Sequence, residues 1–381
     1  MNSTNFESES ELKNNPIENA VGIRGSLLGF YHTHETKFHL GFFLAGFVID
    51  YFASEEIANP YVLLQQFFYL TVIAFILSLE HLEEQDSVQI QKMKKLWVYR
   101  GWLLHFFLGT LLNLYSIFYF KSASLFSSIF YVVFLLAVLV ANELPQIRKS
   151  GVNVRWALWV VCLFSFFSIL FPHVLGFVGW LPFLLSAAST TLFLYLHFRW
   201  LMKYQKKLNE MFRSFLLPGV GILILFVALY FAGLIPPVPM AVKHMGVYHE
   251  LEKTDGAFLL SHERKSWKIW QNGDQDFSAR PGDSIYFFAE IFSPAHFSDE
   301  VTIHWLYKDA KLGWKTSDKV KMAINGGRHE GFRGYSVKKN YQPGDWRVQV
   351  ETTDGREMGR LYLKIVADSG QEPRQWLQER F

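Results

Sequence analysis

A series of long apolar blocks separated by short polar gaps fills residues 37–235, and this pattern limits the possible folds more than any other feature. A helix needs about 20 mostly apolar residues to cross the hydrocarbon core of a bilayer. Helices can span lipid because they satisfy their own backbone hydrogen bonds, whereas open strands cannot. The sequence therefore predicts an all-α polytopic membrane bundle of about seven transmembrane helices. The predicted spans are Phe38–Ala53, Tyr61–Leu79, Trp97–Phe120, Ser122–Ala141, Trp156–Leu175, Phe177–Phe198 and Ser214–Leu234.

The first of these blocks is the weakest prediction. Phe38–Ala53 is short, and it contains Asp50, an acidic residue that is costly in hydrocarbon. A re-entrant or interfacial segment is the alternative interpretation of this block.

Polar residues dominate on both sides of the apolar blocks, which divides the chain into parts. We predict a polar N-terminal segment (1–36), the helical bundle (37–235), a proline-rich junction (236–241), a β-rich domain (242–368) and a C-terminal tail (369–381). Pro236, Pro237 and Pro239 end the last helix and make the junction stiff and extended. The tail is predicted to be a short helix or disordered.

Basic residues are distributed unevenly among the gaps between the predicted spans. Cytoplasmic loops of membrane proteins carry an excess of Lys and Arg. The first, third and fifth gaps hold only Lys121. The second, fourth and sixth gaps, with their flanking residues, hold Lys92, Lys94, Lys95, Arg100, Arg148, Lys149, Arg155, Arg199, Lys203, Lys206, Lys207 and Arg213. We therefore predict that these gaps and the N-terminus are cytoplasmic, and that the C-terminal domain lies outside the cytoplasm.

The C-terminal part changes to the two-residue period of β-strands. Trp346, Val348 and Val350 alternate with polar residues, which is typical of a half-buried strand. Turn sequences such as Pro343-Gly344-Asp345 and Asp354-Gly355 separate the strands. Short strands with this punctuation predict an all-β, immunoglobulin-like antiparallel sandwich. The chain has one cysteine, Cys162, which lies in an apolar block. No intrachain disulfide is therefore possible, and the β-domain must depend on its core for stability.

An ordered set of motifs between Pro281 and Val366 resembles a bacterial domain of unknown function, the family numbered twenty-nine fourteen. The motifs are His304-Trp305, Gly327-Arg328, Gly331-Phe332-Arg333-Gly334-Tyr335-Ser336, Pro343-Gly344-Asp345-Trp346-Arg347-Val348 and Asp354-Gly355-Arg356. The resemblance implies a small C-terminal β-domain attached to membrane segments, and it implies no activity. Together with the loop charges, it predicts a multi-pass protein of the bacterial cytoplasmic (inner) membrane with a periplasmic C-terminal domain.

Two features of the β-domain are candidate ligand-binding sites. Four glycines surround Arg328 and Arg333, which could grip an anionic group bidentately. The alternative is that these arginines are solvated or paired with Asp and Glu. Trp305 and Trp346 are predicted in the core, whereas Trp314 is predicted to be exposed and able to bind a sugar ring or a peptide.

Polar residues inside the predicted spans are the other candidates. His105, Gly109, Asn113 and Ser116 form one stripe on the third predicted span, and Asp50 lies near the outer end of the first. The functional interpretation is a lined pathway or a proton-bearing site. The alternative is a packing face where small and polar residues let helices approach each other.

No phosphate loop, nucleophile elbow, zinc-protease motif or dinucleotide fingerprint is present in the sequence, so no reaction can be named. We predict no metal and no cofactor. The net charge of +3 is spread along the chain, which argues against nucleic acid as a partner. The leading hypothesis is a non-enzymatic protein, held by the lipid bilayer, whose β-domain binds an extracytoplasmic protein or envelope polymer. The alternative is a transporter or membrane-embedded enzyme with a polar site around His105.

The predicted topology can be tested with a reporter that is active only outside the cytoplasm. Fusion after Phe381 should give an active reporter, and fusion after Lys207 should give a silent one, because the basic gaps stay inside. The reverse pattern of activity would show that the orientation is wrong.

Overall fold

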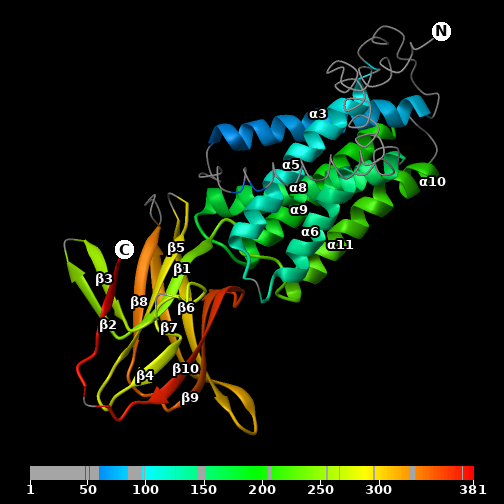
Figure 1. The fold of residues 1–381 in the computed structure, drawn as a ribbon. Coiled ribbons are helices and arrows are strands. Elements are labelled where there is room, and N and C mark those ends of the chain that lie inside the picture. The colour runs from blue at the N-terminus through cyan, green and yellow to red at the C-terminus, as the bar shows by residue number, and fades with distance from the viewer. Residues whose placement is uncertain are drawn as a thin grey trace, which may run out of the picture.

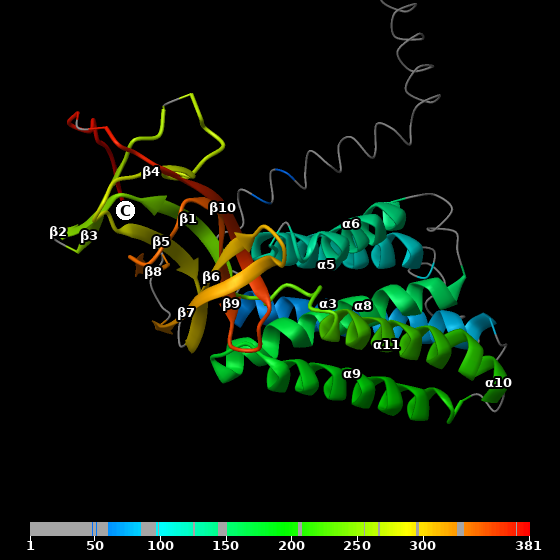
Figure 2. The same cartoon turned by 90° about the horizontal axis from the view of Figure 1, so that it is seen from below.

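The computed structural model describes residues 48, 51, 60–84, 97, 99–124, 126–143, 151–204, 208–254, 256–265, 267–294, 297–325, 331–370 and 372–381. These residues form a helical bundle and a β-domain, and the β-domain lies beyond one end of the bundle (Figures 1 and 2).

Five helical segments among the described residues are long and apolar enough to cross a membrane. They are α3 (Pro60–Glu84), α5 (Arg100–Ser122), α8 (Val152–Leu175), α9 (Trp180–Leu201) and the continuous segment Leu208–Phe231. The last segment consists of α10 (Leu208–Met211), the π-helix η1 (Phe212–Leu216) and α11 (Leu217–Phe231). A sixth apolar helix, α6 (Ile129–Glu143), has 15 residues.

The helical nature of the later predicted blocks is therefore confirmed, with one difference in length. Ser122–Ala141 was predicted to span, but α5 ends at Ser122 and α6 begins only at Ile129, so α6 is shorter than a full span. Phe38–Ala53 lies outside the described residues except for Val48 and Tyr51. The total of seven spans stays a prediction.

Helix α8 is the central helix of the bundle. It packs against α3, α5, α9 and α11, and most of its side chains are buried, including Trp156, Cys162 and Phe164. Phe164 stacks on Phe226 of α11 with 4.3 Å between the ring centroids. The helix ends at Gly176, which adopts a φ of 78° that favours glycine, and its N–H donates to the carbonyl of Pro172.

The β-domain contains three sheets. The first has the order β1-β5-β8, with β1 (Ala241–Tyr248), β5 (Ile285–Phe292) and β8 (Phe332–Lys338). The second has the order β4-β10-β9-β6-β7, with β4 (Asp276–Ala279), β10 (Glu357–Ala367), β9 (Gly344–Thr352), β6 (Ser298–Asp309) and β7 (Gly313–Asn325). The third has the order β11-β3-β2, with β11 (Leu377–Arg380), β3 (Ala257–His262) and β2 (Glu250–Thr254).

The first two sheets share one apolar core. Phe287 and Ile291 of β5 meet Trp305 of β6 and Trp346 of β9 in a single buried cluster. The predicted core positions of Trp305 and Trp346 are confirmed, because these side chains are only 1% and 3% exposed. The immunoglobulin-like topology itself stays a prediction.

Two expectations about the β-domain are wrong. Its strands were predicted to be antiparallel, but β4 pairs with β10 in parallel. The tail was predicted to be a short helix or disordered, but it forms β11 on the free edge of β3. Edge pairing supplies its backbone hydrogen bonds, and Phe381 packs 5.1 Å from Phe288, so the tail gains contacts that its own sequence does not reveal.

The β-domain is docked on the bundle by the turn between β9 and β10. Tyr230 at the end of α11 donates to the Asp354 carboxylate at 2.8 Å, and the Arg356 guanidinium lies 5.1 Å from the Tyr230 ring centroid. Burial raises the pKa of Asp354, but the charge of Arg356 and the hydrogen bonds that the carboxylate accepts outweigh burial and lower it overall. Next to this turn, the buried Glu357 carboxylate accepts a hydrogen bond of 2.5 Å from Ser124.

A second docking contact joins β6 to the loop between α8 and α9. The Ser298 amide donates to the carbonyl of Gly176 at 2.9 Å, and the Val178 amide donates to Asp299 at 2.9 Å. The first contact uses Ser124 in the α5–α6 loop, and the second uses Gly176 and Val178 in the α8–α9 loop. These two loops are gaps that are poor in basic residues. We call this end of the bundle, formed by residues 123–128, 176–179 and 230–235, the docking end.

Trp305→Ala should lower the free energy of unfolding of the β-domain by about 3–5 kcal/mol, because it removes a fully buried aromatic side chain. The measurement is proteolysis of the full chain in detergent at increasing urea concentrations. Ile269→Ala, at a position that is 84% exposed, is the control and should change stability by less than about 0.5 kcal/mol. Equal effects would contradict the assigned core.

Arg356→Ala should loosen the docked turn, because it removes the cation that holds the Asp354 carboxylate beside Tyr230. Hydrogen exchange of amides in residues 345–360 of the full chain should become faster. Arg380→Ala, on the exposed β11, should leave this exchange unchanged. Unchanged exchange in Arg356→Ala would show that the apolar contacts alone hold the turn.

Candidate functional site

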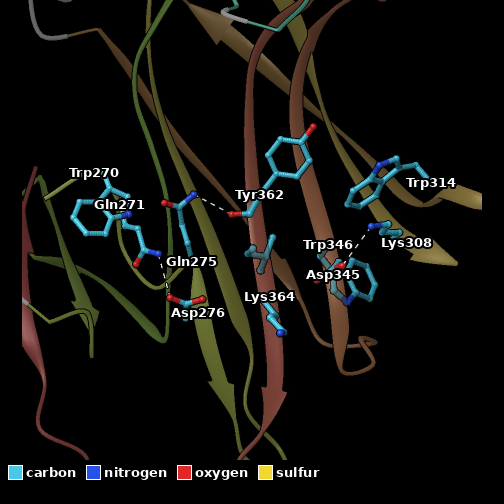
Figure 3. A pocket seen from close by; sticks show the side chains of 11 residues that line it. Trp270, Gln271, Gln275, Asp276, Lys308, Trp314, Asp345, Trp346, Tyr362 and Lys364 are labelled. Atoms are coloured by element: carbon cyan, nitrogen blue, oxygen red, sulfur yellow. Dashed lines mark hydrogen bonds and ion pairs between the residues drawn. The ribbon is translucent and has the colours of Figure 1, made fainter. Parts of the chain in front are cut away.

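A groove with a volume of about 490 Å³ lies on the outer face of the five-stranded sheet. Side chains from β4, β6, β7, β9, β10 and the loop before β4 line it (Figure 3). Strands turn alternate side chains to opposite faces, so the residues between the core positions of β9 and β10 point into this groove. We call it the aromatic groove, after Trp270, Trp314 and Tyr362 on its walls.

The three aromatic side chains come from separate elements. Trp314 lies on the edge strand β7 opposite Lys308 of β6, and Tyr362 lies on β10. The rings of Trp314 and Tyr362 are 5.8 Å apart between centroids. In Figure 3, Tyr362 and Lys364 lie between Trp314 on one side and Trp270 on the other. Trp270 is 66% exposed, and its ring packs edge-on against Trp267 with 5.3 Å between the ring centroids.

Polar groups between the aromatic walls are held in place by hydrogen bonds. The Asp276 carboxylate accepts from Lys268 at 2.5 Å and from Gln271 at 3.1 Å, and these bonds lower its pKa. Lys308 pairs with Asp345 at 3.7 Å. The groove therefore combines flat apolar faces with fixed donors and acceptors, which is the usual composition of a binding site for a small molecule or polymer.

Arg347 of β9 places a cation against Trp314, one of the walls of the aromatic groove. Its guanidinium lies 4.8 Å from the Trp314 ring centroid, within the range of a cation–π contact. Its Nε atom is buried and has no hydrogen-bond partner in the part of the chain that the structure describes.

One end of the aromatic groove reaches the docking end of the bundle. Phe126, in the loop between α5 and α6, packs edge-on against Tyr362 with 5.5 Å between centroids. The Arg360 guanidinium lies 5.1 Å from the Phe126 ring, and its Nη1 donates to the Tyr362 hydroxyl at 3.1 Å. Glu357 accepts hydrogen bonds from Arg360 at 2.5 and 3.1 Å and fixes its position.

A polar group adjoins the groove on the same face of the sheet. The His304 ring lies 2.8 Å from Glu351 through Nδ1 and 2.8 Å from Thr316 through Nε2. Both ring nitrogens are therefore used, and His304 joins β6 to its two neighbouring strands.

The ligand-binding residues predicted from the sequence do not form one site. Arg328 lies outside the described residues. Arg333, on β8 of the other sheet, forms an ion pair with Glu290 at 3.4 Å, as the alternative interpretation expected. Trp314 lies in the aromatic groove and is half-buried, because Tyr362 and Arg347 pack against it. Binding by any of these residues stays a prediction.

Of the predicted intramembrane residues, the structure describes His105 and Asn113, which both lie on α5. Asp50 lies outside the described residues. His105 is half-buried and its Nδ1 lies 3.4 Å from the Asn142 side-chain nitrogen of α6. Asn113 is half-buried on the same helix. No group of His, Cys, Asp or Glu suited to a metal ion occurs among the described residues.

Sequence reasoning missed two polar pairs inside the bundle and most of the aromatic groove. Glu80 of α3 accepts from Arg155 of α8 at 2.5 Å, and His197 of α9 lies 2.9 Å from Ser78. In the groove, Tyr362 could have been found as an outward position between Leu361 and Leu363, but Trp270 comes from a loop without periodicity.

Comparison with known proteins gives one family match and several solved structures with low TM-scores. No curated protein matches the sequence. An immunoglobulin-like protein from Pseudomonas aeruginosa is 12% identical over 32% of this chain and 97% of its own, with a TM-score of 0.19. A β-glucosidase from Listeria innocua is 12% identical over 32% of this chain and 16% of its own, with a TM-score of 0.19. The alkylpurine DNA glycosylase AlkC from Pseudomonas fluorescens is 10% identical over 70% of this chain and 76% of its own, with a TM-score of 0.20.

Residues 298–365 match the model of a family described as "Protein of unknown function (DUF2914)". The matched region includes Trp314 and Tyr362 of the aromatic groove and the turn that docks on the bundle. The resemblance noted in the sequence is thus confirmed, and the C-terminal region of this chain carries a DUF2914 domain.

Proposed function

We propose that this protein is a membrane-anchored binding protein that holds a glycan of the cell envelope in the aromatic groove, outside the cytoplasm. The observation that carries the proposal is the set of aromatic side chains, with Trp314 on one side, Trp270 on the other and Tyr362 between them (Figure 3). The helical bundle anchors the β-domain, and docking keeps the groove at a constant place relative to the bilayer.

The chemistry of the groove favours a sugar polymer over a protein segment. The faces of aromatic rings carry negative partial charge and pack well against the positively polarised C–H groups of a sugar ring. The flanking side chains, including Gln271, Gln275 and Asp345, supply donors and acceptors for hydroxyl groups. An extended peptide would instead need free backbone groups of a strand edge. Lys364 lies on β10 between β4 and β9, and its backbone is paired on both sides.

The alternative proposal, a transporter or membrane-embedded enzyme, has one supporting observation in the bundle. His105 of α5 and Asn142 of α6 meet across two helices. The proposal of a binding protein accounts for more of the chain, because it uses both the docked β-domain and the open groove. Loss of transport in His105→Ala, with binding to glycans absent in the unaltered chain, would favour the alternative.

Trp314→Ala should weaken glycan binding roughly 2- to 10-fold, because an aromatic contact of this kind contributes about 0.5–1.5 kcal/mol. The probe is purified peptidoglycan and the soluble oligosaccharides released from it, added to the full chain in nanodiscs. Binding is measured by co-sedimentation and by tryptophan fluorescence.

The matched control for this experiment is Tyr335→Ala, which removes an exposed aromatic side chain from β8 on the other sheet. It should leave binding unchanged. Absence of binding to envelope glycans, or equal losses in the two variants, would contradict the proposed function.

A further inference from the structure

We propose that the glycan bound in the aromatic groove is attached to a membrane lipid through an anionic group. This inference rests on the proposed function and names the class of ligand: an anionic glycolipid or lipid-linked oligosaccharide, rather than a free envelope polymer. It follows from where the groove ends and from which side chains lie at that end.

The aromatic groove ends at the surface of the bundle. Tyr362 connects Trp314 in the groove to Phe126 in the α5–α6 loop, with centroid distances of 5.8 and 5.5 Å. Phe126 lies between the last residue of α5 and the first residue of α6, which is where these apolar helices leave the bilayer. A glycan that follows the aromatic side chains from Trp314 therefore arrives at the membrane surface.

An exposed apolar face continues from Phe126 along α6. Phe126, Phe130 and Val133 are 52%, 72% and 55% exposed. Phe130 and Val133 are three residues apart, so they lie on one side of α6. In a membrane this side contacts lipid tails, and it begins where the groove ends. The lipid part of a ligand whose sugar occupies the groove is thus placed against α6.

Cations lie between the apolar face of α6 and the sugar-binding walls. Arg360 contacts both Phe126 and Tyr362, although Glu357 neutralises part of its charge. Arg347 lies opposite Tyr362 on the neighbouring strand, and its guanidinium lies 4.8 Å from the Trp314 ring centroid. A guanidinium suits a phosphate or carboxylate because it presents a planar fork of N–H donors. This is the position at which a phosphate would join a lipid to its glycan.

The ligand class can be tested with two matched probes. The first is the acidic glycolipid fraction of a bacterial lipid extract, and the second is the glycan released from the same fraction by mild acid. Each is offered at equal sugar concentration to the full chain in phosphatidylcholine nanodiscs, and retained sugar is measured. The unaltered chain should retain the lipid-linked form about tenfold more than the released glycan, which corresponds to about 1.4 kcal/mol.

Variants separate the lipid contact from the sugar contact. Phe126→Ala should remove the preference for the lipid-linked form, whereas Phe126→Leu, which keeps an apolar side chain, should retain it. Arg347→Gln should also reduce the preference, because it removes the cation that faces the anionic link. Phe231→Ala is the control, because Phe231 is exposed at the end of α11 and does not line the groove. It should leave the preference unchanged.

The outcomes distinguish this inference from the proposed function. Equal retention of the lipid-linked and released glycans would overturn the inference and leave the proposed function standing, because the groove would then bind a free polymer. Retention of neither form, together with no binding to peptidoglycan, would overturn both. A preference that Phe126→Ala does not change would also overturn the inference.

Discussion

The hydrogen bonds that Asp354 and Glu357 accept from the bundle hold the β9–β10 turn, and the two strands that extend from it, against the helices. Both carboxylates are in or next to the β9–β10 turn. Their partners are Tyr230, near the end of α11, and Ser124, just after the end of α5. A hydrogen bond to a charged group contributes about 1.5–3 kcal/mol, and more is lost if the partner leaves a buried charge behind. The turn therefore resists separation from the bundle, and β9 and β10 extend from it as fixed strands. These two strands carry Arg347 and Tyr362 into the aromatic groove.

Docking of this kind changes what the proline-rich junction does. Pro236, Pro237 and Pro239 predicted a stiff, extended spacer after the last helix. In the structure, Ile235 and Val238 are buried in the core of the bundle, while Met240 is buried in the core of the β-domain. Val178, from the α8–α9 loop, also packs in the core of the β-domain. Because residues of each part complete the core of the other, the two parts behave as one body and not as beads on a linker.

The fold could be predicted from the sequence wherever the burial of a residue follows from the spacing of apolar residues near it in the chain. Apolar blocks predicted the helices, and alternation placed Trp305 and Trp346 in the core. Features that depend on distant partners could not be predicted in this way. The tail became β11 because β3 offers a free edge and Phe381 meets Phe288, and neither fact is visible in residues 369–381. The short α6 and the parallel β4–β10 pair also depend on the packing of other elements.

The candidate site shows the same division. Trp314 could be selected from its own neighbours in sequence, because a large aromatic between Gly313 and Lys315 is poorly suited to a core. Its partners, Tyr362 and Arg347, are 48 and 33 positions away in the numbering and become neighbours only through the order of strands in the sheet. Phe126 is further still, in a loop between the apolar helices α5 and α6, and it meets Tyr362 only because the domain is docked. A ligand that contacts Trp314, Tyr362 and Phe126 together would thus touch both parts of the protein. The docked turn then has a role beyond stability, since it keeps the aromatic walls of the groove in line with the exposed apolar side of α6.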